Sequence, residues 1–388
     1  MTLIMRCFVR FCLSLIALGF SKAETASLPS LEQPWDWPII FKDDRHPLLQ
    51  EVALQGRIML QYAESSDAGI SHGTRDAPEF TRWGEDLEVR RWRVGSRIRF
   101  FKKWLLDGNI NIRPDWQPFY LNIYDVQLTW MQSPAFNVSL GKSKVPYTQE
   151  YAISSARIPT LERSLLTNQV ITTPLTGLTI YGEKYLWRYR FGFYANDPRP
   201  LSEFSHFNSG YALLAKLAHD FGPHFGLKHA WIGLDAFLHT APPRNGQPAY
   251  SRSFALTSEI THGAWSFLGD ALYSGGEGIQ SIGLTLLPTW RFHPKWQFVA
   301  RYHVVGSMGG DGISPPIRYD RFVGETTAAL TTDGRGDFAQ TAYLGLNHFI
   351  RGHHLKLMTG IEYLKLEGGR SGGGYDGWTF FSGLRFLF

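Results

Sequence analysis

The chain has 388 residues, and its 39 Lys and Arg against 34 Asp and Glu give a formal net charge of +5. Without Arg6, Arg10 and Lys22 of the N-terminal segment the balance is 36 against 34, a net charge of +2 that favours no nucleic-acid partner. The two cysteines, Cys7 and Cys12, lie in the same segment, which excludes disulfides, thiolate catalysis and cysteine zinc sites from the rest of the chain.

Residues 1–23 have the pattern of a secretory signal peptide. Arg6 and Arg10 give a positively charged start, residues 11–20 form a short apolar run, and Ala23 is a small residue suited to cleavage. A buried N-terminal helix is the alternative, but it does not explain the placement of the charges. Because the apolar run is too short to span a membrane, we expect a removable signal and an exported protein.

Residues 24–50 show no clear period, and we interpret them as a short periplasmic segment with a turn at Asp43–Asp44. From residue 51 to 388, the chain repeats about ten residues of alternating apolar and polar side chains and then a turn or loop. Helical spacing would mix Arg with Phe on each face, and no apolar run approaches the roughly 18 residues of a spanning helix. We therefore predict an all-β fold, a transmembrane antiparallel β-barrel of about 16 strands over residues 51–388.

The most regular segment runs from Leu87 to Phe101. Because strand side chains alternate between two faces, one face is mostly apolar and the other is a ladder of arginines. In a soluble sheet the apolar face would lie in a core, whereas in a transmembrane barrel it would lie in lipid and the arginines in an aqueous lumen. The polar faces of this segment and of an earlier one carry Arg91, Arg93, Arg97, Arg99 and Arg57.

The end of the chain favours the barrel. Aromatic residues alternate from Trp378 to the C-terminal Phe388, which resembles the recognition signal of bacterial outer-membrane proteins. Together with the signal peptide, it predicts a protein of the Gram-negative outer membrane. Its expected partners are outer-membrane lipid and lipopolysaccharide, and the barrel-assembly machinery through Phe388.

A long polar stretch follows the segment that ends near Gly141. Pro146 and Pro159 make a continuous strand through it unfavourable, and it is too polar for lipid, so it must cover the barrel mouth or fold into the lumen. This stretch resembles the phosphate-selective porins O and P, as does the run Arg-Arg-Trp-Arg-Val-Gly at residues 90–95. The matching loop residues are Gly141, Lys144, Pro146, Tyr147, Glu150, Ser154, Ser155, Glu162, Arg163 and Ser164.

The resemblance implies a water-filled barrel with an inward-folded constriction loop, assembled as a homotrimer, that passes anions and prefers phosphate. Arg91, Arg93, Arg97 and Arg99 then become the anion pathway, with Arg57 beside them. The constriction loop would present Lys142, Lys144, Arg157 and Arg163, while Glu150 and Glu162 would weaken its field.

Arginines suit this task because their planar donors match two phosphate oxygens and stay charged. Weak sites in series let the ion leave as well as bind. Since adjacent arginines repel one another, we expect Asp125 and Glu162 to face the ladder. For Arg188, Arg190, Arg301 and Lys356 we expect only solvation of the lumen wall.

We therefore predict a porin for passive diffusion of small anions, with phosphate or polyphosphate as the expected solutes and with no enzymatic activity, metal or cofactor. A general porin with a slight anion bias and a structural or adhesive barrel plugged by its loops are the alternatives. An outer-membrane hydrolase would need a Ser and His constellation at the outer rim, and the sequence offers no convincing one.

Overall fold

The computed structural model describes residues 37–65, 71–72, 84–113, 119–170, 174–197, 204–240, 250–276, 278–309, 312–313, 336–367 and 373–388. The predicted signal peptide at 1–23 lies outside these residues, as do residues 24–36. Within the described ranges, no helix combines the length and the apolar character needed to cross a membrane.

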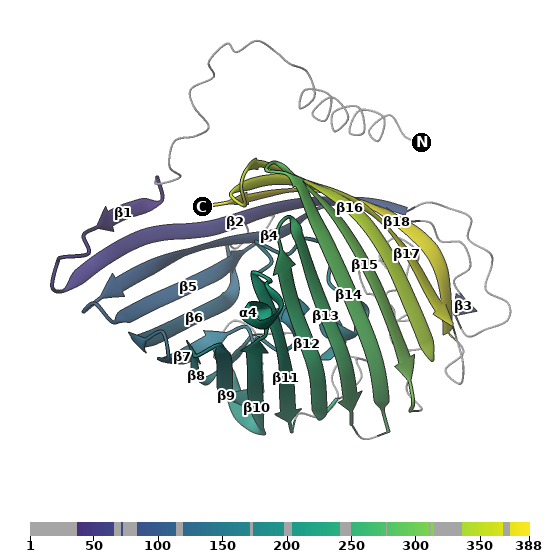
Figure 1. Ribbon diagram of the computed structural model, residues 1–388, viewed down its shortest axis with the longest axis horizontal. Coiled ribbons are helices and arrows are strands. Elements are labelled where there is room, and N and C mark those ends of the chain that lie inside the picture. The colour runs from purple at the N-terminus through teal and green to yellow at the C-terminus, as the bar shows by residue number, and fades with distance from the viewer. Residues whose placement is uncertain are drawn as a thin grey trace, which may run out of the picture. The chain divides into compact units, whose positions relative to one another are not determined.

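Sixteen antiparallel strands form a closed barrel, as the alternating pattern predicted (Figure 1). The first barrel strand, β2, pairs with the last, β18, with Leu60 opposite Leu384. The strands are β2 (Leu49–Ser65), β4 (Gly84–Phe100), β5 (Trp104–Ile112), β6 (Tyr120–Ser133), β7 (Phe136–Ser143), β8 (Leu175–Lys184), β9 (Trp187–Asp197), β10 (His206–Asp220), β11 (His229–His239), β12 (Arg252–His262), β13 (Trp265–Gly275), β14 (Gln280–His293), β15 (Trp296–Ser307), β16 (Phe338–Arg351), β17 (Leu355–Glu367) and β18 (Gly373–Leu387).

Two further strands lie outside the closed ring. The strand β1 (Ile39–Lys42) pairs with β2, and a turn that includes Asp44 joins them. The sequence predicted this turn, but it gave no period from which β1 could be recognised. The two-residue strand β3 (Ser71–His72) pairs with β18.

The two faces of the barrel wall differ in polarity. Leu140, Leu234 and Phe191 belong to an exposed apolar outer surface, and Trp265 stacks on Trp290 near the turns, with ring centroids 5.3 Å apart. Such a band with aromatic residues at its rim matches the lipid-facing surface of outer-membrane barrels. The inner face carries polar residues instead.

The two ends of the barrel also differ. At one end the β6–β7, β8–β9, β12–β13 and β14–β15 connections have only two residues each. In the β8–β9 turn, Tyr185 and Leu186 both have positive φ, the backbone of a tight hairpin that matches the strand twist. Because bacterial barrels keep their short turns in the periplasm, the long connections lie at the outer end.

The connection between β7 and β8, described over residues 144–170 and 174, folds into the barrel. It contains the short helices α2 (Gln149–Ala152) and α3 (Leu165–Val170), while α4 (Gly222–Phe225) lies in the β10–β11 connection. Tyr147, Leu161 and Leu166 of the β7–β8 loop are almost fully buried and join the hydrophobic cluster inside the wall. This confirms the predicted inward-folded constriction loop.

Candidate functional site

The β7–β8 loop is attached to the strands on one side of the lumen through the start of α2. Both carboxylate oxygens of Asp270 on β13 accept backbone hydrogen bonds, from Gln149 and Glu150, each at 2.9 Å. Lys216 on β10 donates to the carbonyl of Pro146 at 2.8 Å. An acidic group at the first amides of a helix replaces the partners that those amides lack within the helix. These bonds therefore position the first half of the loop.

The tip of the loop is attached to β16, β17 and β18. Asn347 donates to the carbonyl of Pro159 at 2.9 Å, and Lys356 donates to the carbonyl of Ile158 at 3.3 Å. Arg385 alone donates to four backbone carbonyls, those of Ser155, Ile158, Thr160 and Leu161. Because buried carbonyls must find donors, these three side chains stabilise a backbone that forms no regular structure.

Two glycines let the loop approach the wall closely. A Cβ at Gly383 of β18 would lie 2.8 Å from Leu161, and a Cβ at Gly283 of β14 would lie 2.8 Å from Leu166. Such distances are shorter than normal contacts, so a larger residue at either position would displace the loop.

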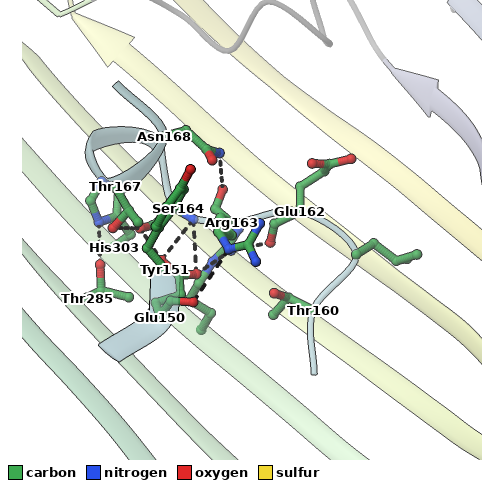
Figure 2. A network of polar contacts seen from close by, with 12 residues as sticks. Glu150, Tyr151, Thr160, Glu162, Arg163, Ser164, Thr167, Asn168, Thr285 and His303 are labelled. Carbon is green, nitrogen blue, oxygen red and sulfur yellow. Dashed lines mark hydrogen bonds and ion pairs between the residues drawn. The ribbon is translucent and has the colours of Figure 1, made fainter. Parts of the chain in front are cut away.

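Glu150 lies at the centre of a buried polar network (Figure 2). Its carboxylate accepts a hydrogen bond from the Ser164 amide at 3.0 Å and another from the Ser164 hydroxyl. Arg301 of β15 forms ion pairs with both Glu150, at 3.2 Å, and Glu362 of β17. Glu150 has no exposed surface, so it shapes the loop rather than facing a solute.

Glu162, the second acidic loop residue, is bound by Arg90 and Gln61. The Arg90 Nε and Nη2 atoms lie 2.8 and 3.2 Å from its two oxygens, and Gln61 donates at 3.0 Å. Burial by itself would raise the pKa of Glu162, but the charges of Arg90 and Arg91 and the hydrogen bonds outweigh it, so the pKa falls to about 2. The carboxylate is therefore ionised at neutral pH.

Arg90 was missed by the sequence analysis because strict alternation directs it outward. The register between β2 and β4 shifts where Met59 opposes Arg91 and Leu60 opposes Val89, which leaves Arg90 as an extra residue in β4. Such a bulge re-aims side chains, and here Arg90 reaches Glu162 of the internal loop. The sequence carries no separate signal for this bulge.

The loop brings two of its predicted basic residues, Lys144 and Arg163, close to Arg57, Arg91 and Arg93 of the barrel wall. Lys144 donates to the carbonyl of Ile153 at 2.9 Å and lies 4.4 Å from the Tyr151 ring centroid. Arg163 donates to the same carbonyl at 2.8 Å and lies 5.2 Å from the same ring. Arg57 donates to Ser155 at 2.9 Å.

Arg57 of β2 stands directly opposite Arg93 of β4 in the register. The Arg93 guanidinium lies 3.2 Å from the Tyr124 ring centroid, and its Nε donates to Asn111 at 2.7 Å. No ion pair joins either arginine to a carboxylate among the described residues. We call Arg57, Arg91, Arg93, Lys144 and Arg163 the lumenal cation cluster.

The pKa of Lys144 reflects this crowding. Burial, followed by the charges of Arg163, Arg91, Arg57 and Arg93, lowers the pKa of its ammonium group to about 6. Because all four arginines contribute, the five side chains share one electrostatic environment, in which the arginines supply the positive charge at neutral pH and Lys144 adds its charge only as the pH falls toward 6.

The lower part of the ladder is different because its charges are paired. Arg97 lies 3.1 Å from Asp107, and Arg99 forms ion pairs with Asp44 and with Glu51, the latter at 3.7 Å. The predicted arginine ladder is therefore not uniform. Arg91 and Arg93 form no ion pair with a carboxylate of the described residues, whereas Arg97 and Arg99 do. These partners were not among those expected from the sequence.

The remaining predicted residues lie elsewhere. Asp125 accepts a hydrogen bond from Asn109 at 2.8 Å, and no ion pair joins it to a basic residue of the described ranges. Lys142 lies two residues from the outward-facing Leu140, so strand alternation does not direct it toward the cluster. Arg157 is exposed at the loop tip, near the β16–β17 turn. There burial lowers the pKa of His353 to about 4, and the charges of Lys356, Arg291 and Arg157 lower it further.

The expectation of simple lumen solvation was wrong for Arg301 and Lys356. Both are buried, at 3% and 0% exposure, because they hold the loop. Arg188 and Arg190 do face the interior, and each guanidinium lies over an aromatic ring. Among the described residues, no group of three or more His, Cys, Asp or Glu could hold a metal ion.

Comparison with known proteins agrees with this architecture. The family model described as phosphate-selective porin O and P matches residues 75–253, which include the ladder and the internal loop. The chain is an outer-membrane porin, and over these residues it is similar to this family. The match confirms the resemblance predicted from the motifs, and it places the porin in the Gram-negative outer membrane. No curated protein sequence matches the porin closely enough to count as a relative.

Solved structures with the same fold cover nearly the whole porin at low identity. The anion-selective porin from Comamonas acidovorans is 14% identical, with a TM-score of 0.55 over 87% of this chain and 99% of that one. The outer-membrane channel DcaP of Acinetobacter baumannii is 13% identical, with a TM-score of 0.55 over 90% and 99%. Salmonella typhi OmpF, in a complex with daunomycin, is 12% identical, with a TM-score of 0.56 over 90% and 100%. At these identities the likeness concerns the fold alone.

Proposed function

We propose that this porin passes small anions in preference to cations, with phosphate among its solutes, and that the lumenal cation cluster is the selective region. The observation that carries the proposal is the meeting of Arg57, Arg91 and Arg93 from the wall with Lys144 and Arg163 from the loop. The two acidic loop residues do not neutralise this cluster fully, because Glu150 is paired with Arg301 and Glu162 with Arg90.

The chemistry of the cluster suits an oxyanion. An anion that enters a narrow lumen loses part of its hydration, and fixed positive groups must replace it. Arg93 is held by Tyr124 and Asn111, while its Nη1 atom is buried and has no hydrogen-bond partner among the described residues. A buried donor without a partner costs free energy, so a solute oxygen at this atom would be stabilised.

The test is the reversal potential of the porin in a planar bilayer under a potassium chloride gradient, followed by phosphate titration of the current. We expect a potential on the anion side and block of the chloride current at low phosphate concentration. A potential near zero without block would leave a general porin with only a slight bias. Absence of conductance would support a barrel plugged by its loop.

We also propose that the porin assembles as a homotrimer. The family resemblance supports this proposal, as does the likeness in fold to Vibrio cholerae OmpT in its trimer form, which is 11% identical with a TM-score of 0.50. Sedimentation of the detergent-solubilised porin would test it, and a monomeric mass would refute it.

A further inference from the structure

A cavity lies in the lumen on different strands from the lumenal cation cluster. It has a volume of about 460 Å³, and the ends of β7 to β12 near the short turns form its wall. Pro146, Gln149 and Ala152 of the internal loop line it as well. This volume falls in the range of small-molecule sites, which is roughly 300 to 1,000 Å³.

Two arginines on neighbouring inward positions of β9 dominate the cavity. The Arg188 guanidinium lies 4.0 Å from the Trp231 ring centroid, and the Arg190 guanidinium lies 4.6 Å from the Tyr181 ring centroid. Stacking on a ring holds a guanidinium in one orientation and leaves its edge donors available. Both arginines are therefore positioned before any solute arrives.

The charges in this cavity separate into a negative and a positive end. Arg188 lies between Glu183, at 3.2 Å, and Glu259, at 3.7 Å, so these three side chains together carry one negative charge. No ion pair joins Arg190 to a described carboxylate, so its positive charge is uncompensated. Gln149 of the loop donates to Glu259 at 2.5 Å and so holds that carboxylate at the cavity wall.

Lys216 and Asp235, which also line the cavity, form a pair at 2.7 Å and add no net charge. The cavity thus has one free positive group and one excess negative charge within a single small volume. A solute with only a negative charge is attracted by Arg190 but repelled by Glu183 and Glu259. A solute with both charges is attracted by Arg190 through its negative group and by the two glutamates through its positive group.

We infer that this cavity is a binding site for zwitterionic solutes that carry a carboxylate and an ammonium group, as free α-amino acids do. The solute carboxylate binds the planar fork of Arg190, and its ammonium group binds Glu259 and Glu183. The edges of the Trp231 and Tyr181 rings, together with Pro146, accommodate an apolar side chain of the solute. The site is separate from the lumenal cation cluster, so the porin would handle simple anions and zwitterions at different walls.

The test compares three small molecules as blockers of the chloride current in a planar bilayer. L-leucine carries both charges, 4-methylpentanoate lacks the ammonium group, and 3-methylbutylamine lacks the carboxylate. We expect L-leucine to reach half-block at about a tenfold lower concentration than either analogue, since each charge-assisted contact is lost separately. Equal half-blocking concentrations for the three would overturn the proposal.

Two variants localise the effect. Arg190→Gln should raise the half-blocking concentration of L-leucine about tenfold, and Glu259→Gln should do the same while its amide oxygen still accepts the bond from Gln149. Arg93→Gln in the cation cluster should weaken phosphate block without changing L-leucine block. If Arg93→Gln instead weakens both blocks equally, the separate site is refuted.

A second measurement does not depend on conduction. Saturation-transfer nuclear magnetic resonance on the detergent-solubilised porin would report L-leucine binding directly, with Glu259→Gln as the comparison. Binding that disappears in this variant supports the site even if the channel shows no anion preference. Absence of L-leucine binding to the wild-type porin refutes the site even if phosphate blocks the current.

Discussion

Replacing Arg93 should reduce anion preference more than replacing Arg97 or Arg99 of the same strand, because no ion pair joins Arg93 to a carboxylate among the described residues, whereas Arg97 and Arg99 are paired. An anion that passes about 5 Å from a unit charge gains about 0.8 kcal/mol at the dielectric constant of water, about 80. That energy is about a fourfold change in local concentration, with the opposite change for a cation. The two changes multiply to about sixteenfold in the ratio of anions to cations, and screening by salt at about 0.1 M reduces this to about fivefold. We therefore expect Arg93→Gln to lower the anion-to-cation permeability ratio by about fivefold to sixteenfold.

The matched control is the paired substitution Arg97→Gln with Asp107→Asn on the same wall. Arg97 lies 3.1 Å from Asp107, so the pair contributes little field at a distance and its removal leaves the net charge unchanged. We expect the control to change the permeability ratio by less than about twofold.

The assay is the reversal potential in a potassium chloride gradient at about 0.1 M or below, where the Debye length is at least about 10 Å and screening is weak. Far-ultraviolet circular dichroism and heat-modifiable migration on gels would confirm that both variants form the barrel. If Arg93→Gln and the paired control shift the potential equally, the field of unpaired charges does not set selectivity and the reasoning is refuted.

Three further outcomes follow from the loop and its anchors. Arg301→Ala leaves Glu150 and Glu362 buried without their ion-pair partner. It should destabilise the barrel by about 3 to 5 kcal/mol, measured by urea titration in detergent, and a change below about 1 kcal/mol would contradict a stabilising role of these ion pairs. Gly383→Val should push Leu161 from the wall, cost about 1 to 3 kcal/mol and alter single-channel conductance; unchanged conductance would mean that the loop adapts. The pKa of Lys144 is lowered to about 6, so its amine gains a positive charge as the pH falls through that value. The preference of the channel for chloride should therefore increase from pH 8 to pH 5. Lys144→Gln should abolish this increase.

The sequence alone was sufficient to predict the wall of this protein. Strand alternation has a period of two, so the pattern in each of about sixteen segments predicts which residues face lipid and which face the interior. The run from Arg90 to Gly95 and the motif from Gly141 to Ser164 predicted the family. The prolines in that motif predicted a loop that cannot continue as a strand.

Only the tertiary structure decided which interior charges act together. Whether a basic side chain is free depends on what lies opposite it, and that depends on register and on the path of the internal loop. Arg97 and Arg99 have carboxylate partners from β5, from β2 and from the segment before β2. Arg57 and Arg93 have no such partner in the part of the chain that the structure describes, although the sequence presents all four arginines in the same way.

Two other features also required the structure. The bulge that directs Arg90 to Glu162 is one extra residue in one strand, and alternation cannot reveal it because it is a break in the alternation. Arg301, Lys356 and Arg385 are spread over three strands, and they meet only because the loop tip reaches that wall. A local pattern therefore determined which face each residue takes, whereas pairing between distant segments determined which of these charges remains available to a solute.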